Sequence, residues 1–374
     1  MLNTMFPTIN RESSMLGFGC MRFPTTPDDK IDESEAIRMI RHAIDNGVRY
    51  IDTAYPYHGG ESEIVIGKAL KDGYREKVIL TTKLPVWLVK THEDMMKFLD
   101  EQLKKLDTPY VDFYILHAMN NERMDAMQKL GYKRFYADAI AQGKVRCPGF
   151  SFHDDAKAFL RILHDWDQWG MCQVQMNILD DENQATLEGI REAGRRGVGV
   201  VVMEPLRGGS LLKLPESAEA KLREARPGES NADWAFNFVR SVPGVTMILS
   251  GMNSTEQLDE NCALFSADAK LNDAEFELCA GIGRSMLSGG VVPCTACHYC
   301  VSHCPQGLDI PRLLALYNEH AFSGGGFIAP FAVAAIEPDK RPNNCISCHS
   351  CTSVCPQKIE IPETLAKFSE MMGL

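Results

Sequence analysis

Eight of the thirteen cysteines fall into two runs near the C-terminus that share one spacing. The first run holds Cys294, Cys297, Cys300 and Cys304, and the second holds Cys345, Cys348, Cys351 and Cys355. A proline follows the fourth cysteine of each run, which gives C-x2-C-x2-C-x3-C-P twice. Four thiolates that converge on one small volume can ligate a cuboidal iron–sulfur cluster. The spacing therefore predicts two [4Fe–4S] clusters.

Each run resembles that of bacterial two-cluster ferredoxins, in which three closely spaced cysteines bind one cluster and the cysteine before proline binds the other. One cluster would then use Cys294, Cys297, Cys300 and Cys355. The other would use Cys345, Cys348, Cys351 and Cys304. Residues 304–311 also match residues 355–362, so the repeat has a period of 51 residues and predicts a pseudo-twofold domain. Zinc ribbons lack two such triplets, and a disulfide scaffold would require a secreted chain.

Composition narrows the class of protein. The chain has 374 residues, of which 45% are apolar, enough for one large and one small domain. Its net charge of −11 argues against nucleic-acid binding, which needs a basic face. Residues 1–15 lack the apolar segment of a signal peptide, and no stretch approaches the roughly 18 apolar residues of a membrane span. Since thiolates persist in reducing compartments, we expect a cytoplasmic protein with neither nucleic-acid nor membrane partners.

Residues 15–262 alternate between short apolar strands and amphipathic helices. Strands are predicted at 15–22, 50–53, 78–83, 111–117, 149–152, 172–175, 199–203 and 246–251. Helices are predicted at 34–46, 61–70, 93–106, 121–142, 155–166, 184–196, 232–240 and 255–264. Thr91 and Asp94 have the spacing of a capping box at the start of the third helix.

Eight strands, each followed by a helix within about 250 residues, predict an α/β protein with a (β/α)8 TIM barrel. A doubly wound open sheet is the alternative, but only Gly17-Phe-Gly19 stands where G-x-G-x-x-G would be expected. The predicted domains are a barrel over residues 1–275 and a small ferredoxin-like domain, helical and irregular, over residues 276–374.

Four polar residues stand at the ends of successive predicted strands. Asp52 ends the second strand, Tyr57 follows in its loop, Lys83 ends the third and His117 ends the fourth. Each residue alone is commonly structural. Catalytic groups of barrel enzymes, however, lie at the C-terminal ends of the strands. Four polar residues at equivalent ends therefore predict an active site.

These four residues are part of a wider resemblance. Residues from about 15 to 265 resemble the aldo/keto reductase family. The segments that carry the resemblance are 17–19, 51–57, 61–67, 81–83, 114–117, 149–151, 173–175, 204–206 and 251–261. Together with the cysteine runs, the chain looks like the iron–sulfur branch of that family. The resemblance implies that Tyr57 is the general acid that protonates the carbonyl oxygen. Lys83 would lower the pKa of Tyr57, Asp52 would hold Lys83 charged, and His117 would orient the carbonyl or relay the proton.

The resemblance also implies binding of NADP(H) or NAD(H). Ser151 and Gln175 would hold the nicotinamide carboxamide. The remaining expected contacts follow the last two strands and are Pro205, Leu206, Gly208, Gly251, Asn253, Gln257, Glu260 and Asn261. Many relatives clamp the 2′-phosphate of NADPH with Lys and Arg where Gly251 and Gln257 stand here, so the choice between the two nucleotides stays open.

Three functions remain open. The first is an oxidoreductase that interconverts a small carbonyl compound and its alcohol with NAD(P)H, with the clusters transferring electrons to or from a protein partner. The second keeps that reaction and makes the clusters structural or oxygen-sensing. The third is an electron-transfer or binding protein whose barrel no longer uses nicotinamide. Relatives often have Asn and Tyr where Phe152 and Met203 stand here, and this difference favours the third function. The intact set of four polar residues favours the first two functions.

Overall fold

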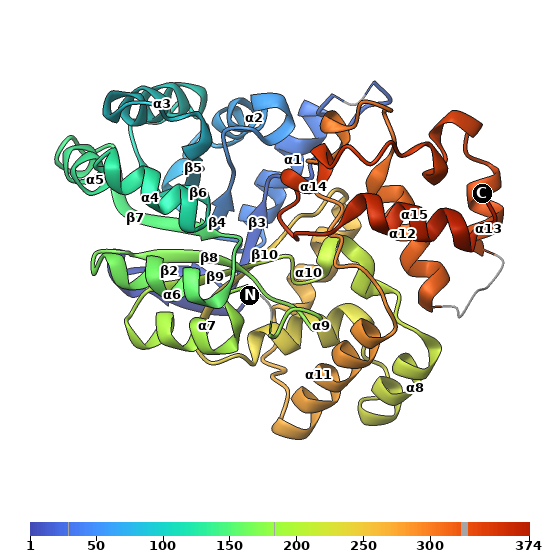
Figure 1. Ribbon diagram of the computed structural model, residues 1–374. Coiled ribbons are helices and arrows are strands. Elements are labelled where there is room, and N and C mark those ends of the chain that lie inside the picture. The colour runs from blue at the N-terminus through green and yellow to red at the C-terminus, as the bar shows by residue number, and fades with distance from the viewer. Residues whose placement is uncertain (29, 183, 323–327) are drawn as a thin grey trace. The chain divides into compact units, whose positions relative to one another are not determined.

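The structure is a computed structural model that describes residues 1–28, 30–182, 184–322 and 328–374 (Figure 1). The chain divides into two compact units. The first comprises Met1–Met176, Asp180–Pro205 and Phe236–Leu271, and the second comprises Asn177–Leu179, Leu206–Ala235 and Asn272–Leu374. The domain boundary after residue 275 stays a prediction.

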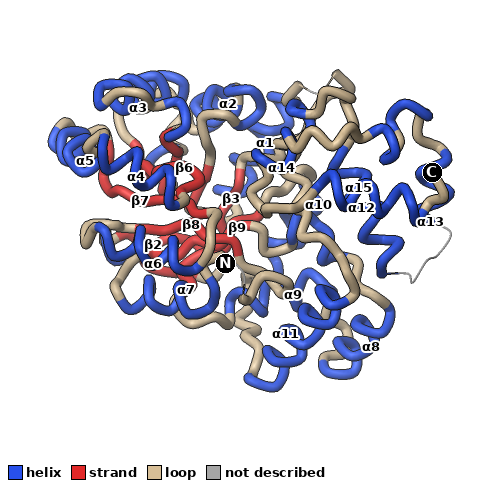
Figure 2. Tube along the Cα trace, viewed as in Figure 1, coloured by secondary structure: helices blue, strands red, loops and turns tan. Residues whose placement is uncertain are grey.

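Eight parallel strands of the first unit close into a barrel in the order β10-β3-β4-β5-β6-β7-β8-β9. The strands, red in Figure 2, are β3 (Leu16–Gly19), β4 (Tyr50–Asp52), β5 (Ile79–Leu84), β6 (Val111–Met119), β7 (Val145–Phe152), β8 (Met171–Gln175), β9 (Gly199–Met203) and β10 (Val245–Ser250). The predicted (β/α)8 barrel is confirmed, and the open doubly wound sheet is excluded.

The helices of the first unit follow the strands along the chain. They are α1 (Glu33–Asp45), α2 (Ser62–Ala69), α3 (His92–Lys105), α4 (Asn121–Lys129), α5 (Tyr132–Ala141), α6 (Ala156–Asp165), α7 (Thr186–Arg195) and α10 (Thr255–Leu264). The capping box of Thr91 and Asp94 is present at the start of α3. The single helix predicted over 121–142 is wrong, because Gly131 adopts a left-handed φ of 75° between α4 and α5, a conformation that glycine adopts without steric cost.

A hairpin that the sequence did not predict precedes the barrel. Strands β1 (Asn3–Phe6) and β2 (Arg11–Ser14) pair antiparallel. The fully buried ring of Phe6 stacks on Tyr50 with the ring centroids 5.6 Å apart. A Cβ on Gly199 would lie 2.7 Å from the Phe6 ring, so only glycine fits there. Because Tyr50 and Gly199 begin their strands, Phe6 closes the N-terminal end of the barrel.

The second unit contains the cysteine runs and several helices. These are α8 (Glu216–Ala225), α11 (Asp273–Ser288), α12 (Ile310–Phe322), α13 (Ile328–Ala334), α14 (Ser350–Ser353) and α15 (Ile361–Met371), while α9 (Asn231–Arg240) begins in this unit and ends in the first. Six of the eight cysteines of the runs, all but Cys297 and Cys348, belong to a cluster with the apolar core of Leu308, Ile310, Leu313, Leu314, Ile359, Ile361 and Leu365. None of the described helices is long and apolar enough to cross a membrane.

The backbone of the second unit repeats with the sequence. Ala296 and Ser347 have φ values of 50° and 52°, and His298 and His349 have values of 63° and 56°. Left-handed conformations are uncommon for residues other than glycine, and both pairs are separated by the period of the cysteine runs. The predicted internal repeat is therefore visible in the local backbone as well as in the residue types.

Candidate active site and cluster-binding site

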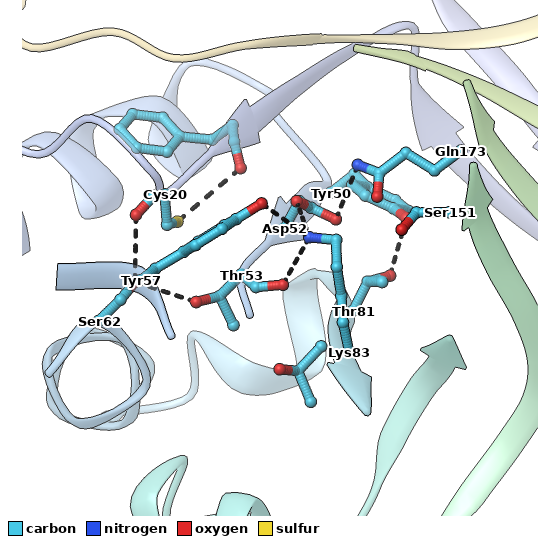
Figure 3. Close-up of polar contacts among 12 residues, drawn as sticks. Cys20, Tyr50, Asp52, Thr53, Tyr57, Ser62, Thr81, Lys83, Ser151 and Gln173 are labelled. Carbon is cyan, nitrogen blue, oxygen red and sulfur yellow. Dashed lines mark hydrogen bonds and ion pairs between the residues drawn. The ribbon is translucent and has the colours of Figure 1, made fainter. Parts of the chain in front are cut away.

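Three of the four predicted catalytic residues converge at the ends of β4 and β5 (Figure 3). Lys83 Nζ donates to Asp52 Oδ1 at 2.6 Å and to the Thr53 carbonyl oxygen at 2.7 Å. The phenol oxygen of Tyr57 lies 3.4 Å from the same Nζ. The parallel register, which pairs Asp52 with Thr81, brings the end of β4 beside Lys83. A buried ammonium thus contacts both a carboxylate and a phenol.

His117, the fourth residue, lies where β6 is irregular. The register of β6 against β7 shifts between Leu116 and Met119, and Ala118 has a left-handed φ of 53°. The His117 ring lies edge-on to Tyr57 with the centroids 6.1 Å apart. Burial, followed by the charge of Lys83, holds the pKa of His117 well below the usual range. The imidazole is therefore neutral at neutral pH.

The pKa of Tyr57 differs in direction from the sequence-based expectation. Burial, followed by the negative charge of Asp52, raises the pKa of Tyr57 well above the usual range of a phenol. Burial also raises the pKa of Asp52, and this rise is opposed by Lys83 and Gln173. Tyr57 is therefore a protonated phenol in the folded chain, which is the form that a proton donor requires.

Gln173 is a residue of this site that sequence reasoning missed. Its Nε2 donates to Asp52 Oδ2 at 3.2 Å, and its buried Oε1 has no hydrogen-bond partner among the described residues. Gln175, which sequence reasoning selected, instead donates through Nε2 to Asp180 Oδ2 at 2.7 Å. Residues two apart on a strand face the same side, so the sequence offered both glutamines for one role.

Ser151 lies directly beside this group. The register of β7 against β8 pairs Ser151 with Gln173. Ser151 Oγ accepts a hydrogen bond from the Ala118 backbone N–H at 2.7 Å. A hydroxyl that accepts one bond keeps its own O–H for donation. The structure thus places Gln173, with its buried acceptor oxygen, next to a serine that can donate.

The predicted nucleotide contacts occupy both units. In the first unit, Pro205 follows β9, and the turn after β10 and the helix α10 hold Gly251, Asn253, Gln257, Glu260 and Asn261. Asn253 donates its backbone N–H to Gln257 Oε1 at 3.1 Å, and Asn261 Nδ2 donates to Ser250 Oγ at 3.1 Å. In the second unit, Leu206 precedes a 3-10 segment (Arg207–Leu212) in which Gly208 has a φ of 65°.

Two small cavities of the second unit gather the eight cysteines of the runs. One is lined by Cys294, Cys297, Cys300 and Cys355. The other is lined by Cys304, Cys345, Cys348 and Cys351. All eight are free thiols. Each cavity therefore combines a triplet from one run with the last cysteine of the other, and four converging thiols fit the ligand set of a [4Fe–4S] cluster.

Comparison with known proteins agrees with both parts of the chain. Residues 15–284 match the Aldo/keto reductase family, and residues 293–360 match the 4Fe-4S dicluster domain. The chain belongs to the aldo/keto reductase family. The chain also carries a 4Fe-4S dicluster domain.

Individual relatives match parts of the barrel. "Probable aldo-keto reductase 1" of Glycine max is 27% identical over 209 residues, which is 52% of this chain and 56% of that relative. "Aldo-keto reductase YhdN" of Bacillus subtilis is 38% identical over 114 residues, 28% of this chain and 34% of that relative. Both matches span less than two thirds of the relative. The holo form of an aldo-keto reductase from Bacillus halodurans is 25% identical, with a TM-score of 0.63 over 75% of this chain and 96% of that chain.

Proposed function

We propose that the chain interconverts small carbonyl compounds and alcohols with NADPH or NADH, and that Tyr57 is the proton donor. The contact of Lys83 with both Asp52 and Tyr57 supports this proposal most strongly. A phenol that gives up its proton becomes a phenolate, and an ammonium 3.4 Å away stabilises that charge. A purely structural lysine would not need a phenol at this distance.

The reaction follows from the protonation states of the side chains. A bound reduced nicotinamide would supply hydride to the carbonyl carbon. Tyr57, protonated in the resting chain, donates its O–H to the carbonyl oxygen and transfers the proton as negative charge develops there. Neutral His117 can donate a second hydrogen bond to the same oxygen. Asp52 holds Lys83 in place, so the ammonium lies beside the phenolate when it forms.

The polar atoms beside Asp52 fit a nicotinamide carboxamide. Ser151 has an O–H to donate to the amide oxygen, and the buried Oε1 of Gln173 can accept the amide N–H. We therefore assign the carboxamide to Ser151 with Gln173, and Gln175 remains the alternative. In the first unit, Pro205 after β9 and the residues after β10 would hold the rest of the nucleotide.

The dicluster domain would hold two [4Fe–4S] clusters, one in each cysteine-lined cavity, and each cluster can store one electron. We propose that they exchange electrons with a protein partner in the reducing cytoplasm. Anaerobic holoprotein should be mixed with NADPH or NADH and followed by EPR. Without a carbonyl compound, each nucleotide that is oxidised would supply two electrons, one to each cluster, and release a proton, and we expect this reduction on the timescale of turnover. Clusters that stay oxidised during carbonyl turnover would show instead that they are structural or oxygen-sensing.

Nucleotide binding and turnover test the carbonyl reaction. Saturable binding of at least one of the two nucleotides, with aldehyde-dependent oxidation of the bound nucleotide, is the expected result. Failure of both nucleotides to bind would overturn the proposal. The barrel would then belong to an electron-transfer or binding protein.

A further inference from the structure

The backbone of Lys83 is held by residues that lie outside the catalytic group. Side chains alternate along a strand, so Thr82 points away from the side on which Lys83 Nζ contacts Asp52. Thr82 Oγ1 donates to Glu63 Oε1 at 2.7 Å, and Gln102 Nε2 donates to the same carboxylate oxygen at 2.6 Å. Gln102 Nε2 also donates to the Lys83 carbonyl oxygen at 3.1 Å. A carboxylate of α2 and an amide of α3 thus meet behind β5.

The orientation of the Gln102 amide is fixed from both ends. Tyr114 donates its O–H to Gln102 Oε1 at 2.7 Å. The amide oxygen is thereby used as an acceptor, and the two N–H groups of Nε2 are left for Glu63 and for the Lys83 carbonyl. Glu63, Gln102 and Tyr114 are all fully buried. An apolar replacement of Glu63 would therefore leave buried donors without their acceptor.

The Lys83 carbonyl lies where the neighbouring strand has already ended. The register between β4 and β5 ends with the pair Asp52 and Thr81, two residues before Lys83. The Thr53 backbone N–H donates to the Thr81 carbonyl oxygen at 3.0 Å. Carbonyls two residues apart on a strand point to the same side, so the Lys83 carbonyl also faces the β4 side. The Gln102 amide therefore supplies the hydrogen bond that a longer β4 would have supplied.

The same end of α2 also fixes the loop that carries Tyr57. The helix α2 begins at Ser62, directly after this loop. Ser62 Oγ lies 2.9 Å from Thr53 Oγ1 (Figure 3), and the Thr53 carbonyl oxygen accepts from Lys83 Nζ. Ser62 and Glu63 are neighbours in the chain. The first residues of α2 thus contact both the strand that carries Lys83 and a residue that holds its ammonium.

We propose that Glu63 is a positioning residue, whose buried carboxylate sets the distance between Lys83 Nζ and the Tyr57 phenol and thereby the rate of proton transfer. This inference rests on the carbonyl reduction proposed above. The carboxylate accepts the two hydrogen bonds that join α2 to β5 and α3. Its charge is met by Lys105, whose Nζ lies 3.9 Å from Glu63 Oε2, and by the N-terminal end of α2. Without this acceptor, the end of β5 would shift relative to the Tyr57 loop.

Substitution of Glu63 tests the role in anaerobic holoprotein with an aldehyde substrate. Glu63→Met keeps the length of the side chain and removes the acceptor. It should lower kcat about 10- to 100-fold, the loss that a misplacement of about 1 Å can cause, with nucleotide affinity nearly unchanged. Glu63→Gln keeps an oxygen that accepts both hydrogen bonds and should lose much less. Glu101→Gln is the control and should keep full activity, because Glu101 also pairs with Lys105, at 3.2 Å, but is 47% exposed.

A double substitution separates positioning from general destabilisation. If Glu63 acts through Tyr57, Glu63→Met should cause no further loss of kcat in the Tyr57→Phe protein, whose residual turnover no longer uses the phenol. An equal loss in both backgrounds would make Glu63 merely structural and would overturn the proposal. If Glu63→Met does not fold, Thr82→Val removes one of the two donors to the carboxylate. Its loss should be smaller and should also disappear in Tyr57→Phe.

Crystal structures of the wild type, Glu63→Met and Glu63→Gln give an answer that does not depend on turnover. The separation of Lys83 Nζ and the Tyr57 oxygen should exceed 3.4 Å in Glu63→Met only. An unchanged separation in Glu63→Met would overturn the positioning role, whether or not the wild type reduces carbonyl compounds. If the wild type reduces none and the separation still lengthens in Glu63→Met alone, the positioning role stands and the proposed reaction fails.

Discussion

The ammonium of Lys83 lies 2.6 Å from Oδ1 of Asp52, and these side chains are only 2% and 4% exposed. The second carboxylate oxygen accepts from Gln173 at 3.2 Å. Hydrogen bonds therefore fix both oxygens of the carboxylate. Because the pair is buried, removing one partner would leave the other charge uncompensated and away from water. The pair is therefore sensitive to substitution both in stability and in catalysis.

Asp52→Asn should destabilise the chain by about 3–5 kcal/mol, because it leaves the buried Lys83 ammonium without its carboxylate. It should also lower kcat, because Lys83 is no longer held against Tyr57. Urea unfolding and steady-state kinetics measure the two effects. Asp125→Asn is the control, since it breaks an exposed pair with Arg161 and should cost less than about 1 kcal/mol. An unchanged free energy of unfolding in Asp52→Asn would contradict the charged, buried pair.

Tyr57→Phe should lower kcat/KM for carbonyl reduction by about 10²- to 10⁴-fold, the range of general acid catalysis. Nucleotide affinity should stay nearly unchanged, because the lost hydroxyl faces the carbonyl. Tyr55→Phe is a matched control in the same loop, where Tyr55 packs edge-on against Phe98. Fluorescence titration and steady-state rates give both quantities. Full activity in Tyr57→Phe would rule out Tyr57 as the acid.

Acid should destabilise the barrel through His153, whose side chain is partly buried. Burial lowers the pKa of His153 to about 4. A hydrogen bond with Gln184 opposes this shift, and the charge of Arg123 adds to it. In the unfolded chain a histidine has a pKa of about 6.5, so the unfolded state binds more protons between these values. Stability from His153 is therefore complete above pH of about 6.5 and is lost as the pH falls toward about 4.

His153→Asn tests this pH dependence. The free energy of unfolding, measured across that pH window, should fall less steeply in the variant than in the wild type. Equal slopes in the two proteins would mean that His153 titrates normally in the folded chain.

The crossed arrangement of the cysteines predicts how double substitutions behave. Cys294→Ser with Cys355→Ser alters one cavity only, so the protein should keep about half of the iron that the wild type binds. Cys294→Ser with Cys304→Ser alters both cavities and should disrupt both clusters. Iron analysis and EPR of protein purified anaerobically distinguish the two variants. The reverse pattern would show that each run binds its own cluster.

Much of the fold could be predicted because its signals are local. Short apolar runs that alternate with amphipathic helices predicted the barrel strands, and the spacing of the cysteines predicted the two groups that the cavities bring together. The β1–β2 hairpin was missed because two strands of four residues carry no clear pattern. The break at Gly131 was missed because one glycine inside an amphipathic stretch is compatible with a continuous helix.

The candidate site was predictable in its residue types but not in its electrostatics. Asp52, Lys83 and His117 follow from their places at strand ends. The choice between Gln173 and Gln175 does not follow from the sequence. Both side chains face the same side of β8, and the sequence does not show which of them lies closer to Asp52. The direction of the Tyr57 pKa shift was also hidden, since a sequence shows the charged residues but not the burial that raises this pKa.

The most direct test of the account is the fate of the transferred hydrogen. Anaerobic holoprotein would be mixed with an aldehyde and with NADPH or NADH that carries deuterium at the transferred position, and the alcohol would be examined by mass spectrometry after one turnover. The account predicts deuterium on the carbinol carbon with the wild type and with Tyr55→Phe, and alcohol that forms about 10²- to 10⁴-fold more slowly with Tyr57→Phe. Alcohol without deuterium, or nucleotide oxidation that proceeds only with cluster reduction, would contradict hydride transfer in this barrel.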